Sequence, residues 1–157
     1  MDLQNVNLEK AILASELSPK LKNLKWITPF SYSQNPREEL DFLKKVHEHL
    51  KADSRNKIII THYHFFSLLL NQDLNILNRW YLGHHTHPQI NHEYFQYYKN
   101  FVNKNLNKNN IEVIYLVSST ENEMQFDDFQ VYFSSKCFEK NYVIKNKFSF
   151  YEIKNCN

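Results

Sequence analysis

A run of β-branched residues constrains the fold of this chain more than any other segment. Three isoleucines occupy positions 58–60 of the segment 57–61. A continuous run of this kind is typical of a strand that is buried on both faces of a parallel sheet. We therefore expect a central strand over residues 57–61.

A helix is expected immediately before this strand. Asn35 suits the N-cap, Pro36 suits the first helical position, and Glu38 is placed to close a capping box. Apolar side chains then recur at the spacing of one helix face, at Leu40, Leu43, Val46 and Leu50. The pattern predicts an amphipathic helix of about four turns.

A second helix and a second strand follow, over residues 91–106 and 111–117. Asn109 and Asn110 mark the end of the helix, because asparagine tolerates the left-handed turn that often closes one. The order of strand, helices and strand has the period of a right-handed crossover between parallel strands. This part of the chain therefore indicates an α/β fold.

Two further strands complete the predicted sheet. Residues 24–28 form a short apolar segment that ends at Pro29, and residues 148–153 alternate as an edge strand does, whereas residues 124–138 read as helical. We expect a three-layer, mostly parallel, Rossmann-like sheet of about four strands, over 24–28, 57–61, 111–117 and 148–153, flanked by helices. Residues 1–157 would form a single α/β domain, with residues 1–20 as an N-terminal arm.

Composition narrows the classes of function. The chain has 157 residues and a net charge of +2, which makes no electrostatic case for a nucleic-acid partner. Its single glycine excludes glycine-rich phosphate-binding loops. The sequence contains no transmembrane segment and shows no secretory signal pattern, which by itself favours the cytoplasm.

Six of the eight histidines fall between positions 62 and 92, in two short motifs and one further position. The motifs are Thr61-His62-Tyr63-His64, at a predicted strand end, and a loop that contains His84, His85 and His87. Alternation beyond a strand places His62 and His64 on one side of the backbone, so two such pairs could form a tetrahedral site for zinc or another divalent metal. The candidate metal ligands are His62, His64, His84, His85 and His87. The alternative is a polar loop whose histidines bond locally, because Asp73 and Glu93 do not stand at ligand spacing.

A second candidate site contains Arg79, Trp80 and Tyr81, which precede the only glycine. An arginine flanked by aromatic rings recognises phosphates, carboxylates or sugar hydroxyls. Thr61 joins this ligand-binding set, because ligands gather at the carboxyl ends of strands in α/β sheets. The alternative is structural: Trp80 closes the core and Arg79 pairs with a carboxylate. The residues themselves indicate no catalytic nucleophile, and Cys137 and Cys156 are expected to be two free thiols.

The order of several short segments resembles the soluble carboxyl-terminal region of polytopic, glycosyltransferase-like membrane proteins (GT-C type) from A/T-rich bacteria. The likeness extends over residues 17–156 and rests on Leu24-Lys25-Trp26-Ile27, on Asn78-Arg79-Trp80-Tyr81, and on the segments 35–39, 57–65, 94–99 and 111–115.

This resemblance implies an accessory soluble domain that is non-catalytic alone. In such transferases the catalytic acidic residue belongs to a membrane loop that this chain does not contain, so no catalytic residue is carried over. The domain would contact a glycan acceptor or a protein partner, such as a membrane glycosyltransferase subunit, on the non-cytoplasmic side. Cys137 and Cys156 could then form a disulfide. Two other functions stay open: a small histidine–metal hydrolase, and a sugar- or nucleotide-binding module built on Arg79, Trp80 and Tyr81.

Overall fold

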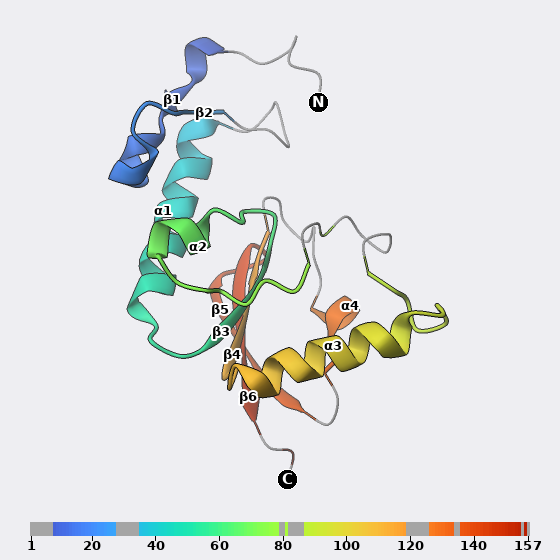
Figure 1. The fold of residues 1–157 in the computed structure, drawn as a ribbon. Helices are drawn as coiled ribbons and strands as arrows, with labels where there is room; N and C mark the ends of the chain where they lie inside the picture. Colours follow the sequence, from blue (N-terminus) through green and yellow to red (C-terminus); the bar gives the residue numbers. More distant parts are fainter. Residues whose placement is uncertain are drawn as a thin grey trace. The chain divides into compact units, whose positions relative to one another are not determined.

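The computed structural model describes residues 8–27, 35–78, 81, 87–118, 126–133, 136–154 and 156. The chain divides into two compact units, one drawn from residues 1–53 and 68–70, the other from residues 54–67 and 71–157. Figure 1 labels their helices and strands.

The first unit contains a small antiparallel sheet of two strands, β1 (Ile12–Leu13) and β2 (Lys25–Trp26). Short 3₁₀ turns lie at Leu8–Lys10, Ala14–Glu16 and Pro19–Leu21. The strand predicted over 24–28 therefore exists as β2, but it pairs with β1 and belongs to no larger sheet.

Helix α1 (Pro36–Ala52) also belongs to the first unit and confirms the predicted helix. The Asn35 side chain accepts a hydrogen bond from the backbone N–H of Arg37, over 2.9 Å, and thus caps the helix. The predicted apolar stripe is fully buried at Leu40, Leu43, Val46 and Leu50. The buried carboxylate of Glu39 accepts a hydrogen bond from the Trp26 indole, over 3.0 Å, which ties α1 to β2.

The second unit contains a four-stranded mixed sheet. Its strands are β3 (Lys57–Thr61), β4 (Val113–Val117), β5 (Cys137–Ile144) and β6 (Phe148–Lys154), in the order β3-β4-β6-β5. β3 and β4 are parallel, whereas β6 runs antiparallel to both of its neighbours. The predicted three-layer, mostly parallel, Rossmann-like sheet is therefore wrong, because the sheets of the described residues are mostly antiparallel.

The prediction failed in the C-terminal part of the sheet, at β5 and β6. β6 lies inside the sheet and is not an edge strand. Within the segment 124–138, which was expected to be helical, the described helix is the short α4 (Asp127–Gln130), and β5 begins at Cys137. β5 and β6 form a hairpin whose turn places Asn146 at a φ of 63°.

β3 is an edge strand, although its sequence indicated a central one. All five of its residues are buried. The segment after α2 (Phe66–Leu70) covers its outer edge: the Ile59 N–H donates to the Leu74 carbonyl over 3.1 Å, and the Asn75 side chain donates to the Lys57 carbonyl over 3.0 Å. A covered edge thus produces the same apolar run as a central strand.

Helix α3 (Phe95–Lys108) packs against this sheet (Figure 1). Val102 and Leu106 of α3 belong to the same buried cluster as the even-numbered strand residues Ile58, Ile60, Ile114 and Leu116. Aromatic side chains around α4 complete this cluster, among them Phe126, Phe129, Tyr132 and Phe133. The main core of the second unit therefore lies between the sheet, α3 and α4.

Asparagine occupies the left-handed backbone positions of the described residues. Every non-glycine residue with positive φ among them is an asparagine: Asn23, Asn71, Asn75, Asn110 and Asn146. The chain has 20 asparagines and one glycine, and asparagine is the residue that best tolerates this region after glycine.

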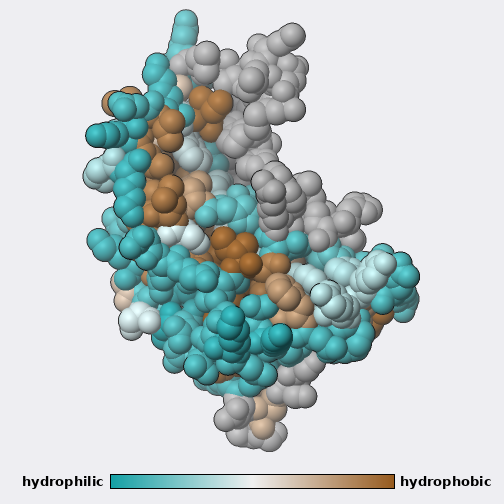
Figure 2. All heavy atoms as spheres, in the orientation of Figure 1, coloured by the Kyte–Doolittle hydropathy of each residue, from teal (hydrophilic) through white to brown (hydrophobic). Residues whose placement is uncertain are grey.

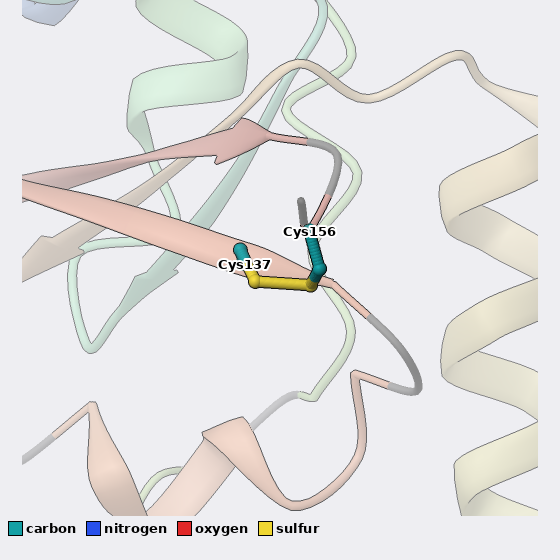
Figure 3. Close-up of a disulfide and its surroundings, with 2 residues drawn as sticks. All are labelled: Cys137 and Cys156. Atoms are coloured by element: carbon teal, nitrogen blue, oxygen red, sulfur yellow. A yellow bond between two sulfur atoms is a disulfide. The ribbon is translucent and has the colours of Figure 1, made fainter.

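The two cysteines form a disulfide, so the expectation of two free thiols is wrong. Figure 3 shows the bridge between Cys137, the first residue of β5, and Cys156, just beyond β6. Their Cα atoms are 5.2 Å apart, within the usual range for a disulfide. Because Cys137 is paired with Lys154 in the sheet, the bridge fastens the open end of the hairpin.

Among the described residues, none of the helices has the length and apolar character needed to cross a membrane. On the face shown in Figure 2, the described surface is mostly hydrophilic, with hydrophobic atoms in smaller groups.

Candidate functional site

The carboxyl ends of β3 and β4 lie side by side, because these strands are parallel and Thr61 is in register with Val117. Thr61 is fully buried, and its hydroxyl accepts a hydrogen bond from the Tyr63 N–H over 3.0 Å. This bond turns the chain away from the strand end. Thr61, predicted to bind ligand, therefore holds the turn that carries His62 and His64.

His62 and His64 both contact Tyr81. Each imidazole centroid lies 6.4 Å from the Tyr81 ring centroid, with His62 edge-on and His64 stacked. The structure thus brings together residues from the two sequence motifs, the histidine pair and the segment that ends at Tyr81. These separations are typical of interacting aromatic rings.

Tyr81 is buried, and its hydroxyl accepts a hydrogen bond from the Asn78 N–H over 3.1 Å. Burial raises the pKa of Tyr81 well above its ordinary value, so the phenol stays protonated at neutral pH. Tyr81 is therefore a neutral, fixed member of the core of the second unit.

His87, from the second histidine motif, reaches the same region through Phe129. The His87 ring lies 4.9 Å from Phe129 and 5.8 Å from Tyr132, and Phe129 lies 5.5 Å from Tyr81. These contacts define the histidine–aromatic cluster, which consists of His62, His64, Tyr81, His87, Phe129 and Tyr132.

Tyr132 fixes the cluster to the surrounding elements. Its hydroxyl donates a hydrogen bond to the Pro88 carbonyl, and its own carbonyl accepts one from the Asn103 side chain of α3, over 2.6 Å. Burial, together with the nearby charge of Asp128, raises the pKa of Tyr132 to about 12. The segment after His87 is therefore held to α4 and α3 by an uncharged tyrosine.

The imidazoles of the cluster occupy an enclosed environment. The Nε2 atoms of His62, His64 and His87 are buried, and contacts with aromatic rings hold these side chains in place. Among the described residues, no group of three or more His, Cys, Asp or Glu side chains is arranged to hold a metal ion. The predicted ligands His84 and His85 lie outside the described residues, as do Arg79 and Trp80.

Sequence reasoning missed Phe129, Tyr132 and Asp128. The aromatic residues of the segment 126–133 are a visible signal, but a helix expected over 124–138 gives them no position relative to the histidines. The short helix α4 and the turn that follows it instead place Phe129 and Tyr132 against His87.

Two hollows lie at the other end of the sheet, where β3 and β4 begin, with volumes of about 480 and 380 Å³. Ile111, Lys136 and Ile153 line both of them. Arg55 and Glu152 form an ion pair there, over 2.8 Å, and Glu112 accepts a hydrogen bond from the Asn56 N–H. These charges link the starts of β3 and β4 to the end of β6.

Comparison of the chain with protein-family models, with curated proteins and with solved structures finds no match.

Proposed function

We propose that this chain is an accessory, non-catalytic domain that works outside the cytoplasm and contacts a glycan acceptor or a protein partner of a membrane glycosyltransferase-like enzyme. The Cys137–Cys156 disulfide is the observation that carries this proposal. Disulfides of this kind form and persist in oxidising compartments, whereas cytosolic thiols are kept reduced.

The packing of the histidine–aromatic cluster also supports a structural role for these rings over a catalytic one. Tyr81 and His87 are buried and held by ring contacts, as core residues are. A hydrolytic centre needs a reactive group that substrate can reach. The cluster instead consists of imidazole and aromatic rings, with Asp128 acting on Tyr132.

The compartment is tested by exporting the chain from a bacterial host and blocking any free thiols before lysis. Mass spectrometry under non-reducing conditions should then recover Cys137 and Cys156 in one bridged peptide pair. A cytoplasmically expressed sample of the same chain is the matched control. Recovery of two blocked, free thiols from the exported chain would contradict the proposal.

The partner is tested by gene context and by activity. A reading frame with several hydrophobic spans, fused to this chain or encoded beside it, supports the proposal, and an isolated gene counts against it. The purified, oxidised chain should release no sugar from nucleotide-linked or lipid-phosphate-linked donors. Turnover by the chain alone would replace the accessory role with an enzymatic one.

A further inference from the structure

Helix α3 presents an exposed row of aromatic and basic side chains. Tyr94, Tyr97, Phe101, Lys104 and Lys108 follow one another at alternating intervals of three and four residues, the spacing of one helix face. The aromatic members are 58%, 78% and 42% exposed, in chain order. We call this row, from Tyr94 at the N-cap to Lys108 at the last turn, the α3 stripe.

The stripe lies away from the part of α3 that packs into the core. Val102 and Leu106 point into the buried cluster. The Asn103 side chain donates a hydrogen bond to the Tyr132 carbonyl. Because a helix has 3.6 residues per turn, Asn103 lies almost on the opposite side of α3 from Phe101. The fold therefore uses the inner face of α3 and leaves Tyr94 and Tyr97 mostly exposed. Phe101 is partly exposed and also contacts the Tyr98 ring, over 6.0 Å between centroids.

The charge along α3 has one sign. Residues 95–108 contain three lysines and no carboxylate, and Glu93 is the single acidic residue between positions 90 and 108. Lys99 lies over the Phe95 ring, 5.8 Å from its centroid, on the packed side. Lys104 and Lys108 continue the aromatic row, so one face of the helix has a ring-rich half and a cationic half.

We propose that the α3 stripe docks this domain on an anionic membrane surface. Tyrosine and phenylalanine are suited to the headgroup region, where one part of the environment is apolar and the other is wet. Lysines beside them are attracted to anionic lipid, each by about 1 kcal/mol near the surface. Charge complementarity thus favours an anionic membrane as the occupant, because a neutral glycan would leave the positive charges of Lys104 and Lys108 uncompensated.

This inference goes beyond the accessory role proposed above, and it requires no membrane enzyme. It is tested by sedimenting the purified chain with two kinds of vesicle, phosphatidylcholine alone and phosphatidylcholine mixed with phosphatidylglycerol. The chain should sediment with the anionic vesicles only, and less as salt is added. The Lys104→Gln/Lys108→Gln variant should bind roughly thirty-fold more weakly, which corresponds to two lysine contacts.

The Tyr97→Ala/Phe101→Ala variant tests the aromatic half and should also lose vesicle binding. Tyr142→Ala is the matched control, because Tyr142 lies on β5 and is 57% exposed. Lys145→Gln, in the hairpin turn, is the control for charge. Phe101 is partly exposed, and the other substituted side chains are exposed. Circular dichroism with thermal unfolding checks that each variant folds.

Several results would overturn the membrane proposal. Equal, weak sedimentation with both vesicles would do so, as would a loss of binding in Tyr142→Ala as large as in the stripe variants. A dimer in solution that Tyr97→Ala/Phe101→Ala abolishes would assign the stripe to a second copy, and salt-independent binding to a neutral oligosaccharide would assign it to a glycan. Failure here leaves the thiol and gene-context tests of the accessory role unaffected.

Discussion

Asn146 illustrates at the scale of one residue how this chain turns without glycine. It lies at the hairpin turn between β5 and β6 with a φ of 63°. We predict that Asn146→Ala lowers the free energy of unfolding by about 1 kcal/mol, because a β-carbon without a local polar group is disfavoured in this region. Asn146→Gly should be close to wild type. Urea unfolding of both variants makes the measurement, and equal stability of the two would refute the explanation.

Thr61 gives a second residue-scale prediction. Replacing it with valine keeps the shape but removes the hydroxyl that accepts the Tyr63 N–H in a buried turn. We expect a loss of about 1 to 3 kcal/mol in the free energy of unfolding, because the donor stays buried without its partner. Thr61→Ser, which keeps the hydroxyl, should lose less than Thr61→Val. If valine matches the wild type, the turn does not depend on this bond.

The buried tyrosines predict how stability depends on pH. Burial is the main cause, and the proximity of Tyr132 the second, that raises the pKa of Tyr98 from 10.0 to about 12. The folded state therefore holds the phenolic proton more tightly than the unfolded chain. Its contribution to stability is complete below pH 10 and is lost as pH rises toward 12. Chemical unfolding across this window should show the decline, and Tyr98→Phe should make it shallower; an unchanged slope would contradict the assignment.

At the scale of elements, the disulfide makes the largest predicted contribution. The bridge closes a loop with a sequence separation of 19 residues. Loop-closure entropy for such a loop predicts that Cys137→Ser/Cys156→Ser lowers the free energy of unfolding by roughly 3 kcal/mol. Denaturant unfolding of the double variant, beside oxidised and reduced wild type, measures it. The reduced wild type should resemble the variant, and a variant as stable as the oxidised protein would contradict the prediction.

The elements that sequence predicted are those with a complete local signal. Helix α1 has its cap and its stripe within one segment, and β3 and β4 are short apolar runs. The pairing of β6 with β4 depends on residues far apart in the chain. The isoleucine run of β3 led to the wrong prediction of a central strand. The segment that contains Leu74 covers the edge of β3 as effectively as a neighbouring strand would.

At the scale of the whole molecule, sequence located part of the candidate site. It named His62, His64, Tyr81 and His87, which the structure gathers into one cluster. It missed Phe129 and Tyr132, because their approach to His87 follows from tertiary packing around α4 and not from spacing. Thr61 stays a predicted ligand contact, and the structure shows in addition that its hydroxyl accepts a buried turn bond.

Metal content is a property of the whole chain and tests the histidine–metal hydrolase directly. The accessory, non-catalytic role proposed above predicts that protein purified without an affinity tag contains far less than one equivalent of zinc, manganese, iron or nickel. Elemental analysis makes the measurement, with a zinc-soaked and dialysed sample as control. Near-stoichiometric zinc that disappears in His62→Ala/His64→Ala would instead establish the metal site.

The mixed sheet has a consequence for the order in which the chain folds. The β5–β6 hairpin closes over a short turn, whereas the parallel β3–β4 pair must wait for the whole crossover that contains α2 and α3. Local pairs form faster, because they close smaller loops. The hairpin can therefore act as an early template that accepts β4 and then β3. Since the cysteines meet where that hairpin opens, their oxidation would keep β5 and β6 together even when the rest of the sheet is unpaired.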